Sequence, residues 1–80
     1  MQNLTLYVLT GCPYCQKVND YLAEKGIGIP TKEIGENPQY REELIKIGGK
    51  KQVPCLVIDG EALYESKDII EWIKNNLNKN

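Results

Sequence analysis

Residues 4–9 form a strand-like segment whose side chains are apolar at nearly every position, and this pattern limits the chain to a few architectures. A strand that faces solvent on one side alternates apolar and polar residues, whereas a near-continuous apolar run is typical of a strand buried on both faces. Such strands occur in parallel or mixed sheets that carry helices on both sides. A chain of 80 residues can form one domain of this kind, and we expect residues 1–80 to do so.

Helices and strands alternate along the rest of the chain. Pro13 suits the first position of a helix, and Gly26 suits its end. Asn37 is expected to cap a second helix that begins at Pro38, and Asp59-Gly60 is a strong signal for a two-residue hairpin. The predicted order is a strand at 4–9, a helix at 13–25, a strand within 29–34, a helix from 38 to the Gly48-Gly49 pair, strands at 53–58 and 61–64, and a last helix capped by Ser66.

This order predicts an α/β fold with the topology βαβαββα. A helix between the first two strands implies that they pair in parallel through a right-handed crossover, and the hairpin makes the last two strands antiparallel. The sheet is therefore expected to be mixed and four-stranded, with helices on both faces. The chain from Lys74 onward is expected to fray. The predicted apolar faces are Tyr40, Leu44 and Ile47 in the second helix and Ile69, Ile70, Ile73 and Leu77 in the third.

Composition excludes several classes of function. The chain has no histidine, which removes Ser-His-Asp and Cys-His catalysis and histidine-liganded metal sites. The formal net charge of −1 gives neither a basic nucleic-acid footprint nor a long acidic tail. No apolar run approaches the ~20 residues of a membrane span, and the first residues lack the features of a signal peptide. We therefore expect a cytoplasmic monomer that binds neither nucleic acid nor membranes.

The chemistry is expected at Cys12-Pro13-Tyr14-Cys15, which follows the first strand and opens the first helix. Two cysteines at this spacing across a helix start can form a disulfide, as in redox-active C-x-x-C sites. Unpaired backbone N–H groups and the positive end of the helix dipole stabilise a thiolate at Cys12, and Lys17 is the nearest cation in the sequence. Cys15 lies one turn inward on the apolar face, so we expect it to be more buried and less acidic. Cys12 is therefore the predicted nucleophile and Cys15 the resolving thiol.

The other interpretations of the pair are a structural disulfide or half of a zinc site. Zinc usually takes four cysteine or histidine ligands, and Cys55 is the only other such residue in the chain. A disulfide that closes so short a loop constrains the unfolded chain little. We therefore expect no metal and a redox role for the pair. Cys55 is expected to be a small core residue, with a regulatory thiol near the site as the alternative.

The chain resembles a glutaredoxin of the short, single-domain bacterial type, whose fold is thioredoxin-like. The likeness rests on Cys12-Pro13-Tyr14-Cys15 after the first strand, Arg41-Glu42-Glu43 in the second helix, Val53-Pro54 at the start of the third strand, and the segment 65–68. The resemblance implies that Cys12 forms a mixed disulfide with glutathione and that Cys15 can resolve it.

The resemblance also implies which residues bind glutathione. Tyr14 and Pro54 would shape the cleft, and the backbone of Val53 would pair with the tripeptide as a strand edge does. The γ-glutamyl end would be held at the start of the last helix, and the glycine carboxylate by a guanidinium on the second helix. The residues implied for these two ends are Ser66, Lys67 and Asp68 for the first and Arg41 for the second.

Three places depart from the glutaredoxin pattern. Leu9-Thr10-Gly11 lacks the lysine that glutaredoxins commonly have before the C-x-x-C motif, which predicts a less depressed pKa for Cys12. Gln52 stands where threonine is usual, and Tyr64-Glu65 replaces the usual Gly-Gly. Glu65-Ser66 is similar to the Glu-Ser pair in the N-terminal domain of glutathione transferases, so glutathione recognition is still implied.

The resemblance therefore implies a glutathione-dependent thiol–disulfide oxidoreductase with no bound cofactor and with glutathione as co-substrate. Its expected partners are disulfide-bearing or glutathionylated proteins, with ribonucleotide reductase as one candidate. One alternative is a redoxin that is reduced by thioredoxin reductase and serves ribonucleotide reductase. Another is an iron–sulfur carrier ligated by Cys12 and external glutathione, although Pro13 and Cys15 argue against it.

Overall fold

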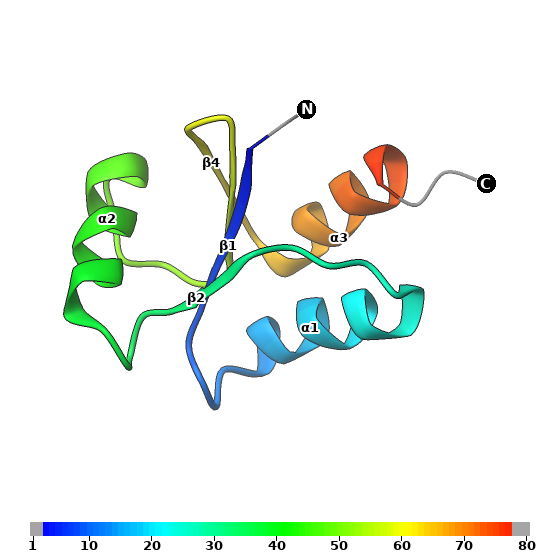
Figure 1. Ribbon diagram of the computed structural model, residues 1–80, viewed down its shortest axis with the longest axis horizontal. Helices are drawn as coiled ribbons and strands as arrows, with labels where there is room; N and C mark the ends of the chain where they lie inside the picture. The colour runs from blue at the N-terminus through cyan, green and yellow to red at the C-terminus, as the bar shows by residue number, and fades with distance from the viewer. Residues whose placement is uncertain (1–2, 78–80) are drawn as a thin grey trace.

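The computed structural model describes residues 3–77, and its elements follow the predicted order (Figure 1). The strands are β1 (Leu4–Val8), β2 (Thr31–Glu33), β3 (Cys55–Ile58) and β4 (Glu61–Tyr64). The helices are α1 (Pro13–Lys25), α2 (Pro38–Gly48) and α3 (Ser66–Asn76). The predicted topology βαβαββα is confirmed.

The strands form one mixed sheet in the order β2-β1-β3-β4. β1 pairs in parallel with β2 and antiparallel with β3, and the Asp59-Gly60 turn joins β3 to the antiparallel β4. Both turn residues have positive φ, 50° at Asp59 and 88° at Gly60, as a two-residue turn between twisted strands requires. Figure 1 shows α1 and α3 on one side of the sheet and α2 on the other. The predicted mixed sheet with helices on both faces is confirmed.

The central strand β1 is buried on both faces, as its apolar pattern predicts. Leu6 belongs to the core under α1 and α3, while the next residue, Tyr7, packs with Leu44 of α2 on the opposite face. Burying one large apolar side chain stabilises a fold by about 1.5–3 kcal/mol, so a chain of this size depends on both small cores. The α1–α3 core consists of Leu6, Val8, Cys15, Val18, Leu22, Leu56, Ile69 and Ile73, and the α2 core of Tyr7, Ile34, Leu44, Cys55 and Val57.

The boundaries of α1 and α2 follow from a side-chain cap and from glycines. The Asn37 side chain accepts a hydrogen bond from the Gln39 backbone N–H at 3.0 Å, and Pro38 takes the first position of α2. Gly26 and Gly49 end the two helices in the left-handed conformation, with φ of 67° and 81°. The predicted limits of these helices are confirmed.

The start of α3 differs from the prediction. Ser66 is the first helical residue rather than the cap, and Glu65 before it makes no side-chain capping hydrogen bond. Glu65 has a φ of 72°, a region that residues with side chains rarely adopt. Because Glu65 makes this sharp turn out of β4, Ser66 already belongs to the helix and cannot cap it.

Two strands are shorter than predicted. β1 ends at Val8, and Leu9 is 40% exposed where the chain leaves the sheet. β3 begins at Cys55, because Pro54, which follows a cis peptide bond, has no N–H to donate to a neighbouring strand. Val53 and Pro54 therefore lie in the loop between α2 and β3.

The ends of α2 and α3 also differ from the prediction. Ile47 and Leu77 are exposed rather than buried, because they lie in and after the last turns of their helices. Lys74–Asn76 belong to α3, so the predicted fraying is wrong for them, and residues 78–80 lie outside the described residues. Within residues 3–77, no helix is long and apolar enough to cross a membrane.

Replacing Leu44 with alanine is expected to lower the free energy of unfolding by about 2–5 kcal/mol, because this fully buried side chain joins α2 to the sheet. Ile45→Ala is the matched control, since the neighbouring side chain is 43% exposed, and it should cost less than about 1 kcal/mol. Urea unfolding followed by circular dichroism measures both values. Equal losses in the two variants would contradict the placement of Leu44 in the core.

Candidate active site

Cys12 lies at the junction where β1 turns into α1. It is the N-cap residue of α1, with an extended backbone (φ −83°, ψ 117°), and Pro13 follows at the first helical position. A hydrogen bond from the Cys12 N–H to the Leu9 carbonyl, at 3.2 Å, closes the turn, and Gly11 within it has a φ of 90°. Since β1 is paired on both sides, its end fixes where the helix begins. This geometry puts a half-buried sulfur at a helix N-terminus.

The Cys12 sulfur is hydrogen-bonded by the first turn of α1. It accepts a hydrogen bond from the Cys15 backbone N–H at 3.4 Å. Partial burial raises the pKa of Cys12, but hydrogen bonds from the backbone and thiol of Cys15 and from the backbone of Tyr14 outweigh burial and lower this pKa below its usual value. A lower pKa gives a larger thiolate fraction at neutral pH. The thiol is thereby suited to attack a disulfide.

Cys15 lies one turn further along α1 and is only 2% exposed. Burial raises the pKa of its thiol to about 12, so the thiol is protonated at neutral pH. The two cysteines therefore differ in access and in acidity, although they lie within the same helical turn. This asymmetry is what the predicted roles of nucleophile and resolving thiol require.

Within residues 3–77, no cation contributes to the lowered pKa of Cys12. The groups of this part of the chain that lower it are N–H and thiol donors. Lys17, the nearest cation in the sequence, lies instead over the ring of Tyr14, with its Nζ 5.6 Å from the ring centre. The thiolate therefore depends on the backbone at the start of α1 rather than on a lysine.

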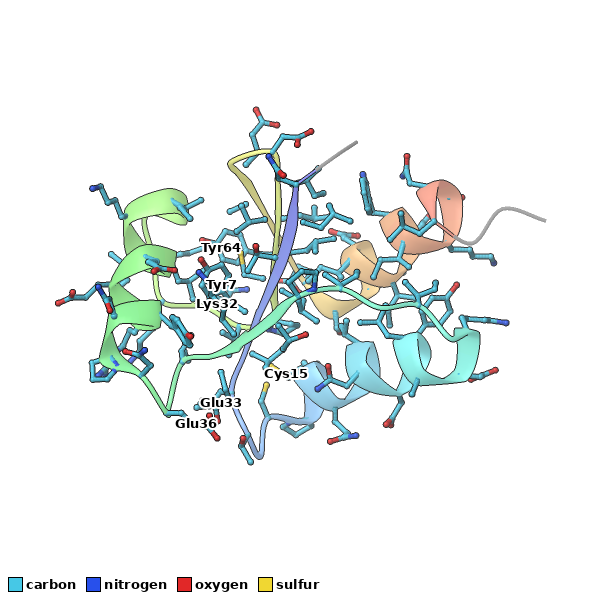
Figure 2. The ribbon with its side chains drawn as sticks, in the orientation of Figure 1. Tyr7, Cys15, Lys32, Glu33, Glu36 and Tyr64 are labelled. Carbon is cyan, nitrogen blue, oxygen red and sulfur yellow. The ribbon has the colours of Figure 1, made fainter. Side chains whose placement is uncertain are left out.

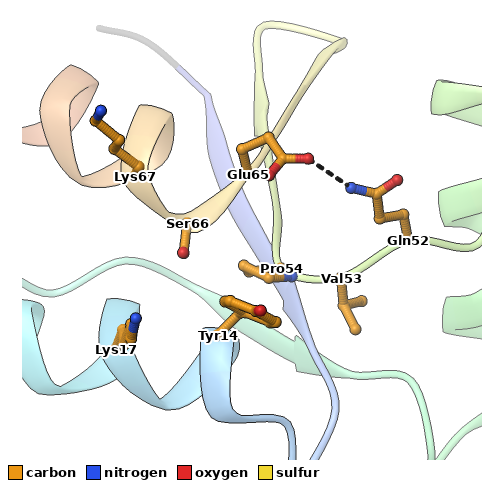
Figure 3. A pocket seen from close by; sticks show the side chains of 8 residues that line it. All are labelled: Tyr14, Lys17, Gln52, Val53, Pro54, Glu65, Ser66 and Lys67. Atoms are coloured by element: carbon orange, nitrogen blue, oxygen red, sulfur yellow. Dashed lines mark hydrogen bonds between the residues drawn. The ribbon is translucent and has the colours of Figure 1, made fainter.

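A cleft of about 540 Å³ lies beside the first turn of α1 (Figure 3). Figure 3 shows the Tyr14 ring next to Pro54, with Ser66 facing them from the start of α3. Tyr14 is 58% exposed, so its ring is available to a bound molecule. The cleft brings together Tyr14, Val53, Pro54, Ser66 and Lys67, which the resemblance implied as glutathione contacts, and its other lining residues are Lys17, Gln52 and Glu65.

Gln52 and Glu65, both unusual for a glutaredoxin, contact one another across the wall of this cleft. The Gln52 side-chain amide donates a hydrogen bond to a Glu65 carboxylate oxygen at 3.2 Å (Figure 3). The bond joins the loop before β3 to the turn before α3. Sequence analysis identified each departure but missed their contact, because nothing in the sequence indicates that the two residues meet.

Arg41 and Asp68 lie apart from the cleft lining. Arg41 lines a separate cavity of about 240 Å³ together with Leu9, Ile34, Gly35 and Lys51. Asp68 is exposed in the first turn of α3 and is not a lining residue of either cavity. A ligand that used every implied contact would have to extend beyond the larger cleft.

Two glutamates whose roles are not indicated by the sequence organise the polar contacts of the sheet. Glu43 of α2 accepts hydrogen bonds from the Tyr7 hydroxyl at 3.0 Å and from Lys32 Nζ at 2.8 Å, which ties α2 to β1 and β2. Glu33 at the end of β2 accepts a hydrogen bond from the Thr10 backbone N–H at 2.9 Å, next to the active-site turn. Figure 2 shows Tyr7 and Lys32 close together, and Glu33 near the end of β1.

Cys55 is fully buried in the α2 core, which confirms its prediction as a core residue. Burial raises the pKa of its thiol to about 11. The neighbouring Tyr64 hydroxyl is also buried and has no hydrogen-bond partner among the described residues, and burial and then Cys55 raise the pKa of this hydroxyl. A thiol so enclosed is poorly placed for regulation. In the described part of the chain, no three Cys, His, Asp or Glu side chains gather closely enough to hold a metal ion.

Comparisons with known proteins point in one direction. Residues 6–80 match the family described as "Glutathione S-transferase, N-terminal domain". The chain is 33% identical over 69 residues to Glutaredoxin 3 of Escherichia coli (strain K12), which covers 86% of this chain and 83% of that protein.

Solved structures show the same fold. Glutathione transferase Omega 3C from Trametes versicolor superposes with a TM-score of 0.81 and 34% identity over 99% of this chain, which spans 35% of that protein. The holo form of glutaredoxin C1 from Populus tremula x tremuloides gives a TM-score of 0.69 at 23% identity and covers 92% of this chain and 76% of that one. The fold is therefore shared by a glutaredoxin and by about a third of a longer glutathione transferase.

Iodoacetamide is expected to modify Cys12 first in the reduced protein, with a pH midpoint below that of the same cysteine in the unfolded chain. The reason is that hydrogen bonds lower the pKa of Cys12, whereas Cys15 and Cys55 are buried, with pKa values of about 12 and about 11. Peptide mass mapping as a function of pH measures the order and the midpoint. In guanidinium, as a control, the cysteines should react alike. First modification at Cys15 or Cys55 would contradict the assignment.

Proposed function

The chain belongs to the glutaredoxin family of thiol–disulfide oxidoreductases, and we propose that its Cys12 and Cys15 reduce disulfides with electrons from glutathione. The observation that carries this proposal is the asymmetry of the pair. Cys12 is half-buried at the tip of α1 with a lowered pKa, while Cys15 is buried with a pKa of about 12. Cys12 is suited to attack a disulfide in solution. Cys15 is suited only to attack a mixed disulfide formed at the neighbouring Cys12.

In the dithiol cycle, the Cys12 thiolate attacks one sulfur of a substrate disulfide, and the other sulfur leaves as a thiolate. The Cys15 thiol then attacks the Cys12 sulfur and closes the Cys12–Cys15 disulfide. The second half of the substrate leaves as a thiolate and takes up the proton that Cys15 loses. A glutathione thiolate reopens this bridge by bonding to Cys12. A second glutathione attacks the bound glutathione sulfur and leaves as glutathione disulfide. Two electrons pass from two glutathione molecules to one substrate disulfide.

In the monothiol cycle, Cys12 alone removes glutathione from a glutathionylated protein. The Cys12 thiolate attacks the glutathione sulfur, and the protein thiolate leaves. A free glutathione then releases the adduct as glutathione disulfide. Both cycles use glutathione as a co-substrate and need no bound cofactor.

The cleft supports a site for the γ-glutamyl end and the cysteine backbone of glutathione. Backbone N–H groups at the start of α3, next to Ser66 and Lys67, suit a carboxylate, and Asp68 in the same turn suits an ammonium group. The loop at Val53 and Pro54 offers backbone groups to an extended peptide. Ligand binding here would bring the glutathione sulfur toward the first turn of α1.

The smaller cavity supports a site for the other end of glutathione. Arg41 and Lys51 both line it, and a guanidinium beside an ammonium group suits the glycine carboxylate. These two cations would supply the charge that the lysine-free stretch before Cys12 does not.

A thioredoxin-reductase-fed redoxin is the second candidate, and one observation favours it. The Glu65 carboxylate lines the cleft where the γ-glutamyl end of glutathione would bind. That end carries a carboxylate as well as an ammonium group, and the Glu65 charge disfavours binding of its carboxylate. Reduction of the Cys12–Cys15 disulfide by purified thioredoxin reductase, compared with reduction by glutathione, distinguishes the two electron donors.

A Cys15→Ser variant incubated with oxidised glutathione is expected to gain a single glutathione adduct on Cys12 rapidly, since the attacking thiol remains and the resolving thiol is gone. Intact mass and peptide mapping measure the adduct. Cys12→Ser is the control and should form none at a comparable rate. A folded Cys15→Ser protein whose Cys12 alkylates normally but forms no rapid adduct would refute glutathione dependence while leaving the nucleophile in place.

Arg41→Ala is expected to raise the KM for glutathione about two- to fivefold and to leave kcat nearly unchanged, because it removes one partly solvated contact to a carboxylate. Lys46→Ala is the matched control, since Lys46 is an exposed cation of the same helix that lines neither cavity. Steady-state reduction of a glutathionylated peptide gives both constants. Equal KM values for the two variants would remove Arg41 from the glutathione site.

A further inference from the structure

Glu33 connects the active-site turn to the neighbouring loop of the sheet. It is the last residue of β2 and stands opposite Val8 in the parallel β1–β2 pair. One carboxylate oxygen accepts the Thr10 backbone N–H at 2.9 Å, and the other accepts the backbone N–H groups of Gly35 and, at 3.1 Å, of Glu36. One side chain therefore holds backbone groups from both the β1–α1 turn and the β2–α2 loop.

The space for this carboxylate depends on a glycine. A Cβ atom at Gly35 would lie 2.9 Å from Glu33 Oε1 and 2.9 Å from Leu9 Cδ1, closer than real contacts allow. Gly35 has no positive φ to explain it, so its lack of a side chain serves close packing. A side chain at residue 35 would therefore displace the ends of the Glu33 and Leu9 side chains.

The partners of Glu33 are hydrogen-bond donors rather than a cation. Hydrogen bonds from Thr10, followed by those from Gly35 and Glu36, hold the pKa of the Glu33 carboxyl below its usual value, so it is ionised at neutral pH. Within residues 3–77, the one ion pair closer than 4.0 Å joins Lys32 to Glu43 and does not involve Glu33. The Glu33 carboxylate therefore carries a negative charge next to the turn between β1 and α1.

The turn that Glu33 holds is the turn that orients Cys12. Thr10 is fixed by Glu33, Gly11 takes a φ of 90°, and the Cys12 N–H returns to the Leu9 carbonyl. The hydrogen bond that follows, from the Cys15 N–H to the Cys12 sulfur, is 3.4 Å long. A small rotation of Cys12 about this turn would break a bond that lowers its pKa.

We propose that Glu33 is a positioning residue for the Cys12 nucleophile: its carboxylate fixes the Thr10-Gly11-Cys12 turn so that the sulfur stays against the N-terminus of α1. The inference rests on the proposed function only in taking Cys12 as the nucleophile. It assigns Glu33 no contact with substrate.

A charge effect of Glu33 would act in the opposite direction. Its negative charge contributes, behind burial and other effects, to raising the pKa of Cys15, and acting through space it would disfavour a thiolate on either cysteine. If Glu33 positions Cys12, losing its hydrogen bonds should slow the alkylation of Cys12. If only its charge matters, removing the charge should speed this alkylation. The two effects can be separated by changing the reach of the side chain and its charge independently.

Glu33→Asp keeps the charge but shortens the side chain, so it cannot reach both loops. Glu33→Gln keeps the length and an acceptor oxygen for Thr10, removes the charge, and replaces the oxygen that accepts from Gly35 and Glu36 with an amide nitrogen. Glu36→Gln is the matched control, because it removes one charge from the same loop and leaves the Glu33 carboxylate intact. The measurements are iodoacetamide alkylation of Cys12 as a function of pH, hydrogen exchange of the Thr10 amide, and thermal unfolding to establish that each variant is folded.

We expect Glu33→Asp to alkylate about three- to tenfold more slowly at pH 7, with its pH midpoint raised, since each pKa unit changes the thiolate fraction by up to about tenfold. The Thr10 amide should exchange faster in this variant, while Glu33→Gln and Glu36→Gln should alkylate at least as fast as the unmodified protein. A folded Glu33→Asp protein with an unchanged pH profile would overturn the proposal. An ordinary thiol midpoint in the unmodified protein would instead count against Cys12 as the activated nucleophile.

Discussion

The hydrogen bond from the Cys15 backbone N–H to the Cys12 sulfur is the interaction on which the proposed active site depends. It exists because the chain passes directly from a strand paired on both sides into a helix, with Cys12 at the N-cap. The strand cannot shift without breaking two sets of ladder bonds. The helix cannot rotate without exposing Cys15, Val18 and Leu22, which it buries in the core. Two buried elements thus fix one sulfur.

The cleft beside this sulfur is built from parts that have little regular structure. Tyr14 comes from α1, Val53 and Pro54 from the loop before β3, and Ser66 from the first turn of α3. The positive φ of Glu65 sets the direction in which α3 begins. The Glu65 carboxylate accepts a hydrogen bond from Gln52 on the loop before β3. The two departures from the glutaredoxin pattern therefore form a single altered wall. Because Gln52 and Glu65 are hydrogen-bonded to one another, replacing one of them with the usual glutaredoxin residue would leave the other without this partner.

Most of the fold could be predicted from the sequence, because its signals are local. Apolar runs, helix-starting prolines and terminal glycines indicated the order of elements, and the Asp59-Gly60 dipeptide indicated the hairpin. The failures are places where distant contacts decide. Ser66 has the chemistry of a cap, but the backbone of Glu65 makes the turn instead. Glu33 has no sequence signal, because its partners come from two loops that meet only in the folded chain.

The same distinction between local and distant contacts applies to reactivity. A lysine beside a cysteine stabilises a thiolate over a range of positions, because a point charge acts at a distance and in many orientations. Backbone N–H groups act only when the sulfur lies close to them and in line. Here the groups that lower the pKa of Cys12 are short-range donors. A protein that relies on such donors must hold the turn before its cysteine more tightly than one that relies on a cation. The hydrogen bonds of Glu33 with Thr10, Gly35 and Glu36 restrain this turn where it begins.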